Sequence, residues 1–309
     1  MRTAFSKTIT ELAERDPRVL LLTGDLGYSV LESFSQKFPD RFFNVGVAEQ
    51  NMVGLATGLA EAGFIPFVYS IATFASLRPY EFIRNGPILH RLPVRIVGIG
   101  GGFEYGHNGA SHFGLEDVGV FRVQPGLTLI APADHEQTRT ALRATWNLPG
   151  PVYYRLGKDD TVTVPGLGGR FALGRAQVVR EGTDLLIIVM GSIASEAVAA
   201  TEALARQGVG CTLVTVASLN PPPVQDLVSL LKDFPVALTV EAHYVVGGLG
   251  SLVSEVIAEH GLHTRLKRCG VRETPDGRSG GQSYLYRRHR LARENLTEEA
   301  LEILRSVRN

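Results

Sequence analysis

The chain has 309 residues, of which 44% are hydrophobic and 20% charged, a composition typical of a folded protein of about two domains. Its 31 lysines and arginines balance 31 aspartates and glutamates, so no global field attracts nucleic acid or an anionic membrane. Two cysteines are too few for a disulfide framework, and no apolar run approaches the roughly 18 residues of a membrane span. Because the amino terminus also lacks the pattern of a secretory signal, we expect a cytoplasmic protein.

Short apolar runs alternate with helix-length segments along the chain. In the first half, apolar residues at helical spacing predict a helix around Phe5, Ile9 and Leu12, and further elements are expected at Val19–Thr23, Phe64–Tyr69, Val94–Ile99, Leu127–Ala131, Asp134–Trp146 and Val152–Tyr154. In the second half they are expected at Leu185–Met190, Ala194–Gln207, Thr212–Val216, Val236–Glu241 and Leu252–His260. Between the halves, the glycine-rich stretch from Lys158 to Gly174 is predicted to be a linker. The alternation predicts an α/β fold with two doubly wound domains, over residues 1–165 and 174–309.

The most informative segment runs from Gly46 to Ala60, with the sequence Gly-Val-Ala-Glu-Gln-Asn-Met-Val-Gly-Leu-Ala-Thr-Gly-Leu-Ala. It places Glu49 in the first turn of a predicted helix, where the helix dipole favours a negative charge. From the residues alone, a first-turn glutamate on a structural helix is the simpler interpretation.

This segment resembles the glutamate-bearing motif of the pyrimidine-binding domain in the transketolase family. It is also similar to 1-deoxyxylulose-5-phosphate synthases and to the beta subunits of 2-oxo acid dehydrogenases. In these families the glutamate hydrogen-bonds the aminopyrimidine ring of thiamine diphosphate and activates this cofactor for chemistry that side chains cannot supply. The resemblance therefore implies that Glu49 is both catalytic and cofactor-binding. It covers nearly the whole chain, and only Arg272–Arg290, rich in basic residues and tyrosines, matches poorly.

The next block, Thr73-Phe74 followed by Arg78 and Tyr80, resembles the family segment in which a phenylalanine packs on the pyrimidine. The resemblance implies that Phe74, Arg78 and Tyr80 contact the cofactor. Leu77 stands where many transketolases place a second aromatic residue, and stacking or hydrogen bonding by Arg78 would compensate for it.

Three further residues match family positions that hold a substrate phosphate. Arg2 lies 23 residues before Asp25 and Ser29 four residues after it, and Arg155 ends the run Pro-Val-Tyr-Tyr-Arg. Arginine suits this task because its forked donors match the oxygens of a phosphate. The resemblance implies that Arg2, Ser29 and Arg155 bind the substrate phosphate, and that Asp25 lies near the cofactor.

The segment from Gly106 to His112 resembles a family block that carries an active-site histidine, and His112 takes that position. A histidine suits proton transfer to sugar hydroxyls and carbonyls near neutral pH. We expect His107 and Asn108 to contact substrate as well. Asn108 stands where many transketolases have an aspartate, and Gly100 stands where a second histidine would fall, which leaves the substrate open.

The family's diphosphate- and Mg²⁺-binding domain, with its Gly-Asp-Gly segment, has no counterpart in this sequence. The resemblance therefore implies a separate amino-terminal transketolase subunit that holds most of the thiamine diphosphate and the Mg²⁺, in an α2β2 heterotetramer. The expected reaction is transfer of a two-carbon ketol unit from a sugar or sugar phosphate to an aldehyde. The alternatives are a 2-oxo acid dehydrogenase beta subunit, a 1-deoxyxylulose-5-phosphate synthase, or a catalytically silent scaffold.

Overall fold

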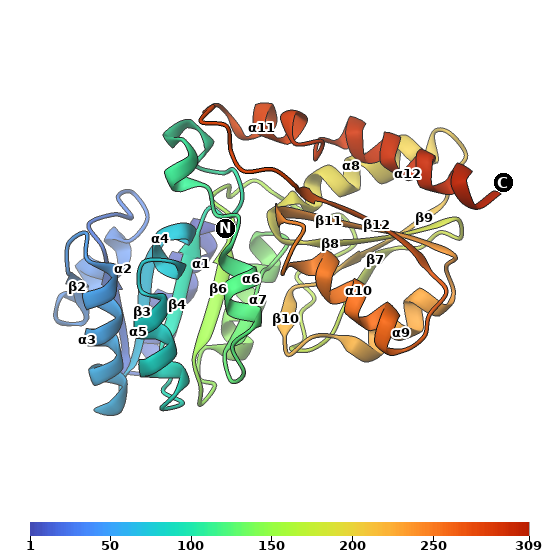
Figure 1. Cartoon of the computed structure of the whole chain (residues 1–309). Helices are drawn as coiled ribbons and strands as arrows, with labels where there is room; N and C mark the ends of the chain where they lie inside the picture. The colour runs from blue at the N-terminus through green and yellow to red at the C-terminus, as the bar shows by residue number, and fades with distance from the viewer. Residues whose placement is uncertain (309) are drawn as a thin grey trace.

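Two β-sheets organise the chain in the computed structural model, which describes residues 1–308 (Figure 1). The first sheet has the strand order β10-β5-β6-β4-β3-β1-β2. Its strands are β1 (Val19–Thr23), β2 (Phe42–Asn44), β3 (Ile65–Ile71), β4 (Arg95–Ile99), β5 (Thr128–Ile130), β6 (Val152–Leu156) and β10 (Ser218–Asn220). Strands β1, β4 and β6 are buried at every position, as expected for a parallel sheet covered on both faces.

Helices cover both faces of this sheet. On one face, α1 (Arg2–Arg15) and α7 (His135–Thr145) pack together, and Phe5 of α1 stacks on Tyr69 of β3 with ring centroids 5.3 Å apart. The other helical segments of this half are α2 (Glu32–Lys37), η1 (Pro39–Arg41), α3 (Glu49–Glu61), α4 (Ala72–Ser76), α5 (Tyr80–Ile83), η2 (Arg84–Ile88), η3 (Gly106–Asn108), η4 (Ala110–His112) and α6 (Asp117–Arg122). Asp134 begins α7 by accepting a hydrogen bond from the backbone N–H of Gln137 at 2.8 Å, which is ordinary N-capping.

The second sheet has the order β12-β11-β8-β9-β7. Its strands are β7 (Gln177–Arg180), β8 (Leu185–Met190), β9 (Cys211–Thr215), β11 (Val236–Tyr244) and β12 (Arg265–Val271). It is accompanied by η5 (Gly191–Ile193), α8 (Ala194–Ala205), α9 (Val224–Lys232), α10 (Leu249–Glu259), α11 (Gln282–Arg288) and α12 (Arg293–Arg308). The inner strands are parallel and β7 is antiparallel to β9 at the edge. The predicted fold class, two α/β domains, is confirmed.

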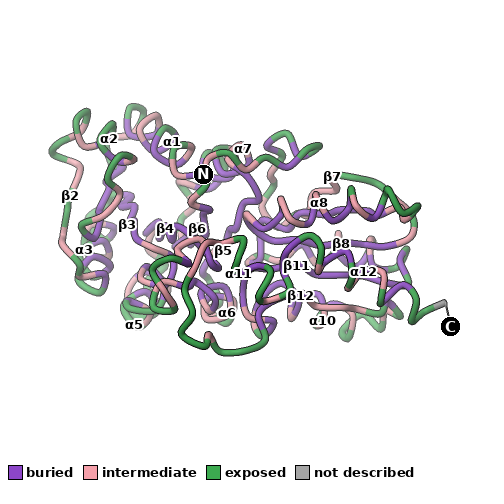
Figure 2. Tube along the Cα trace, turned by 90° about the horizontal axis from the view of Figure 1, so that it is seen from above, coloured by how far each residue is buried: buried purple, intermediate pink, exposed green. Residues whose placement is uncertain are grey.

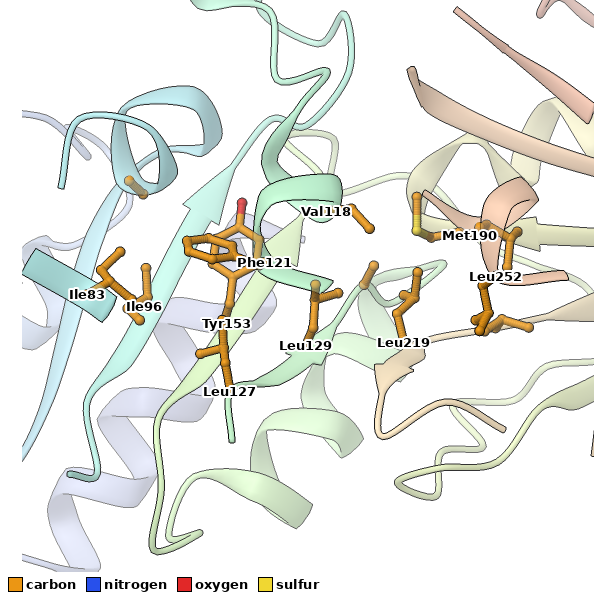
Figure 3. Close-up of a cluster of buried hydrophobic side chains, with 14 of the residues drawn as sticks. Ile83, Ile96, Val118, Phe121, Leu127, Leu129, Tyr153, Met190, Leu219 and Leu252 are labelled. Atoms are coloured by element: carbon orange, nitrogen blue, oxygen red, sulfur yellow. The ribbon is translucent and has the colours of Figure 1, made fainter. Parts of the chain in front are cut away.

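The two domains share one hydrophobic core. Figure 3 shows Phe121 and Tyr153 of the first domain in one cluster with Met190 and Leu252 of the second. Strand β10 strengthens this connection, because it belongs to the second half of the sequence but pairs antiparallel with β5. The inner strands of both sheets are buried in Figure 2, whereas the edge strands β2 and β7 are partly exposed, like the loops and outer helix faces. Among the described residues, no helix is both long and apolar enough to cross a membrane.

Candidate active site

The carboxyl ends of β1, β2, β3 and β4 lie at one edge of the first sheet, because these strands are parallel. Each end leads directly into a segment singled out in the sequence. Asp25 follows β1, Glu49 follows β2, Phe74 follows β3, and the loop with His107 and His112 follows β4. Ligands of open α/β sheets bind at this edge, and the fold therefore concentrates the candidate residues there.

Glu49 is the first residue of α3 and is only 2% exposed. Its Oε1 accepts a hydrogen bond from the Ser70 hydroxyl of β3 at 3.0 Å, and its Oε2 accepts one from Nη1 of Arg78 at 2.8 Å. Gly46, with φ +73°, turns the chain between β2 and α3. The buried carboxylate is thus held by a strand, a helix start and one arginine. Ser70 was not anticipated, although a serine at the end of an apolar strand run was a signal.

Phe74, Arg78 and His112 form one cluster beside this carboxylate. The Arg78 guanidinium carbon lies 3.8 Å from the centroid of the Phe74 ring, and the His112 ring meets Phe74 edge-on at 4.9 Å. His112 Nδ1 lies 3.1 Å from the Ser111 hydroxyl, which fixes the orientation of the imidazole. Phe74 and His112 are half-buried. The cluster therefore presents an aromatic face, a buried carboxylate and an imidazole at the same edge.

Asp25 lies in the turn that adjoins Glu49, because a side chain on Gly24 would come within 3.6 Å of Glu49 Oε1. Asp25 is exposed and has φ +59°. Its Oδ1 accepts hydrogen bonds from Nδ2 of Asn44 at 2.9 Å and from the Tyr28 hydroxyl at 3.1 Å. These two bonds lower the pKa of Asp25 below its usual value, the Asn44 bond being the larger effect.

The loop with His107 and Asn108 also contacts the second domain. Both side chains are exposed. The backbone N–H of Gly280 donates to the Gly106 carbonyl at 3.1 Å, and a side chain on Gly281 would lie 3.4 Å from His107 Nε2. Part of the Arg272–Arg290 segment is therefore packed against this loop.

Arg2 and Ser29 lie at the same sheet edge, on separate segments. Arg2 Nε donates to the carbonyl of Lys158 at 3.0 Å, just beyond the end of β6. Ser29 is exposed with φ +63°, and its backbone N–H donates to Glu32. Their hydrogen bonds fix these local segments rather than joining them to Glu49.

The side chains of Tyr80 and Arg155 hydrogen-bond other parts of the protein, whereas the resemblance implied contacts with the cofactor and with the substrate phosphate. The Tyr80 hydroxyl donates to the Val120 carbonyl at 3.1 Å and accepts from Gln124, so it links α5 to the α6 region. Arg155 is only 4% exposed, and its guanidinium donates to Asp117 and to the carbonyls of Gly114 and Ala242, each at 2.9 Å. Because Arg155 and Tyr153 both bond Asp117 Oδ2 from β6, the arginine faces the interior and connects the two domains.

The same junction holds a second buried carboxylate, Glu241 of β11. Its oxygens accept hydrogen bonds from the backbone N–H groups of Leu249 at 2.7 Å and Gly250 at 2.8 Å, at the start of α10. Burial raises the pKa of Glu241 to about 7 despite these two bonds. Beside it, His243 accepts a hydrogen bond from Gly119 N–H, and burial lowers the pKa of His243 to about 4.

Large apolar side chains are exposed mainly on the first domain. They include Val47, next to Glu49 and 69% exposed, and Leu89, 71% exposed. The others on the first domain are Tyr28, Phe43, Leu55, Phe64, Leu77, Phe82 and Val123. These residues come from several elements, and Val47 is the one nearest to Glu49 in the sequence.

Comparison with known proteins assigns both domains. Residues 1–162 match the family described as "Transketolase, pyrimidine binding domain", and residues 174–295 match "Transketolase, C-terminal domain". The chain therefore belongs to the transketolase family. The matched residues comprise the family's pyrimidine-binding and carboxy-terminal domains.

Relatives that match over nearly their whole length are described as a section or a subunit of a transketolase. A "Putative transketolase C-terminal section" from Methanocaldococcus jannaschii is 37% identical, and the match covers 98% of this chain and 95% of that protein. The "6-deoxy-6-sulfo-D-fructose transketolase subunit SqwH" of Clostridium sp. is 34% identical, with 98% and 94% covered. A solved structure, "Split gene transketolase, inactive beta4 tetramer", superposes with a TM-score of 0.89 at 35% identity, with 98% and 97% covered.

The match to a 1-deoxy-D-xylulose-5-phosphate synthase of Syntrophotalea carbinolica differs in extent. It is 34% identical over 94% of this chain but covers only 46% of that enzyme. The relatives that match over nearly their whole length are thus sections and subunits of transketolases, which are transferases.

Proposed function

We propose that the chain is the β subunit of a thiamine-diphosphate-dependent transketolase that moves a two-carbon ketol unit from a sugar or sugar phosphate to an aldehyde. The observation that carries this proposal is the Glu49 carboxylate. It is buried at a helix start, yet it adjoins the half-buried Phe74 and His112 at the ligand-binding edge of the sheet. A purely structural carboxylate has no need of such surroundings.

The residues fit the pyrimidine end of thiamine diphosphate. An aminopyrimidine ring requires a flat apolar surface and a hydrogen-bonding partner at its edge, which are supplied by the Phe74 ring and the Glu49 carboxyl group. When bound, the cofactor supplies an electron sink that side chains lack. Glu49 would hold the ring by a hydrogen bond, Phe74 would orient it, and His112 would move protons at the hydroxyl and carbonyl oxygens of the sugar.

The diphosphate and Mg²⁺ belong, in this proposal, to an amino-terminal transketolase subunit. Among the described residues, no group of three or more His, Cys, Asp or Glu side chains could hold a metal ion. The exposed Val47, two residues before Glu49, would contact that partner. Shared sites of this kind favour an α2β2 assembly. Two buried free cysteines, Cys211 and Cys269, fit a reducing cytoplasm.

Substrate contacts are assigned to the loops around the same edge. Arg2, Ser29, His107 and Asn108 are exposed or half-buried there and would bind the sugar or its phosphate, with Asp25 nearer the cofactor. Arg155 and Tyr80 are assigned structural roles instead, because Arg155 hydrogen-bonds Asp117 and the Tyr80 hydroxyl hydrogen-bonds the Val120 carbonyl.

A transfer assay tests the proposal. The chain is mixed with a separately made amino-terminal transketolase section, thiamine diphosphate and Mg²⁺, and a panel of ketose and ketose-phosphate donors is offered with aldehyde acceptors. We expect two-carbon transfer only in the complete mixture. Transfer by the isolated chain, or donor consumption that instead releases carbon dioxide from a 2-oxo acid, would contradict the proposed function.

A further inference from the structure

The Arg78 side chain makes the two contacts that the proposed cofactor ring would need. Its planar guanidinium lies 3.8 Å from the centroid of the Phe74 ring, and its Nη1 donates to Glu49 Oε2 at 2.8 Å. A flat group that covers this face of Phe74 while hydrogen-bonding Glu49 has to lie where the guanidinium lies. Arginine suits this position because it both stacks on aromatic rings and donates to carboxylates.

We propose that Arg78 is a stand-in for the cofactor's pyrimidine ring against Phe74 and Glu49, and that it must leave both residues before the ring can bind. This inference rests on the proposed function. It changes the role implied by the family resemblance, in which Arg78 contacts the bound cofactor. In the new role, Arg78 competes with the cofactor for Phe74 and Glu49.

The difference in burial between the two partners explains why such a stand-in is needed and why it can leave. The Glu49 side chain is 1% exposed, whereas the Arg78 side chain is 41% exposed. A buried carboxylate without a partner is costly, so the empty site needs a donor. Because Arg78 reaches inward from solvent, it can return there at small cost, as partly exposed ion pairs are weak. The Ser70 hydroxyl donates to the other carboxylate oxygen of Glu49.

The position of Arg78 in the chain permits this movement. It follows the short helix α4, which carries Phe74, and precedes the buried Pro79. The backbone of this segment is fixed by the bond from Leu77 N–H to the Thr73 carbonyl at 2.9 Å. Because the Arg78 side chain is 41% exposed, rotation about its bonds would carry the guanidinium into solvent.

The test compares Arg78→Met with Arg84→Met in the assembled enzyme. Arg84 is a suitable control because it is exposed on the adjoining turn and donates to Asn85 rather than to Glu49. Calorimetric titration with thiamine diphosphate and Mg²⁺ gives the affinity of each assembly. We expect Arg78→Met to bind about fivefold more tightly than wild type, because the fraction of competent sites rises when the competitor is removed. Arg84→Met should bind like wild type.

A second readout uses the chain alone. Without cofactor or partner, Arg78→Met should lower the melting temperature by a few degrees, because it leaves the buried Glu49 without its cation, while Arg84→Met should not. Weaker or unchanged cofactor binding by Arg78→Met would overturn the inference and return Arg78 to the role of a direct ligand or a bystander. Failure of the wild-type assembly itself to bind thiamine diphosphate would instead contradict the proposed function, and with it this inference.

Discussion

The two buried charge networks of this chain differ in what satisfies them. At the open sheet edge, the Glu49 carboxylate depends on Ser70 and on Arg78, an arginine that is substantially exposed. At the domain junction, Glu241 is satisfied by two backbone N–H groups of α10. Arg155 and Asp117, in the same junction, are paired while both are almost fully buried.

This difference distinguishes the candidate ligand-binding site at Glu49 from the network at the domain junction, which stabilises the fold. The partners of the junction groups are backbone atoms and interior side chains, which cannot leave without disrupting the packing of two domains. Arg78 can leave by rotating into solvent. A buried carboxylate whose own chain supplies a removable partner is prepared for exchange with a ligand, whereas one held by backbone N–H groups stabilises the fold.

The largest expected effect comes from Glu49→Gln, compared with Glu241→Gln. In the assembled enzyme, Glu49→Gln should lower the rate of two-carbon transfer by about 100-fold or more, because the carboxyl group that activates the cofactor is lost while its shape is kept. Glu241→Gln should remain within about threefold of wild type. Initial rates check this, with circular dichroism of each chain as the folding control. Similar losses in both variants would remove the distinction between the networks.

Arg155→Met should cause the next largest effect, on stability. It leaves Asp117 buried without its cation, and Asp117 Oδ1 already has no hydrogen-bond partner among the described residues. We expect the free energy of unfolding to fall by about 3–5 kcal/mol in a denaturant titration. The matched change at the open edge, Arg78→Met, should cost about 1–2 kcal/mol because that arginine is partly exposed. Equal costs would argue that both pairs are structural.

The pH dependence of stability should change when Glu241 is replaced. The pKa of Glu241 is raised from 4.5 to about 7, so the folded state binds its proton more tightly and this group makes stability fall as pH rises between those values. The pKa of His243 is lowered from 6.5 to about 4, so this group makes stability rise between pH 4 and 6.5. The two contributions oppose each other in the wild type.

Glu241→Gln leaves only the His243 contribution. Its stability should therefore rise more steeply with pH than that of the wild type between about pH 4.5 and 6.5, by on the order of 3 kcal/mol in total. Urea titrations at several pH values measure the slope. Parallel curves for the variant and the wild type would show that Glu241 does not titrate as its burial indicates.

The smallest expected effect separates two aromatic residues near the proposed cofactor. Phe74→Leu keeps an apolar side chain but loses the ring face, and the affinity of the assembled enzyme for thiamine diphosphate should fall about three- to tenfold. Tyr80→Phe removes a hydroxyl that bonds Val120 in the interior, so the affinity should not change. A loss with Tyr80→Phe equal to that with Phe74→Leu would restore Tyr80 to the cofactor site.

The sequence allowed the strand–helix alternation to be predicted, whereas Glu49, Phe74 and His112 were assigned to one site only through the family resemblance. The structure places each of them after a strand of one parallel sheet. The sequence did not show which way Arg155 points. Tyr153 and Arg155 share one face of β6 since side chains alternate along a strand, and their common partner Asp117 comes from a different element. Long-range pairing also determines β10, a short strand that joins the first sheet from the second half of the chain.

Local patterns also misplaced the start of α10. The helix was expected from Leu252 but begins at Leu249, inside a glycine-rich run that resembles a turn. The Glu241 carboxylate accepts hydrogen bonds from the first N–H groups of this helix, which stabilises the earlier start. That contact joins residues eight and nine positions apart, beyond the reach of periodicity within either segment.

Calorimetric binding of thiamine diphosphate in the presence of Mg²⁺ tests the central claim most directly. The chain is titrated alone and then after mixing with an equimolar amino-terminal transketolase section. If Glu49 and Phe74 form half of a shared site, binding should be undetectable with the isolated chain and should approach one cofactor per chain in the mixture. Tight binding by the isolated chain would contradict the shared site and require a complete diphosphate-binding site within this chain.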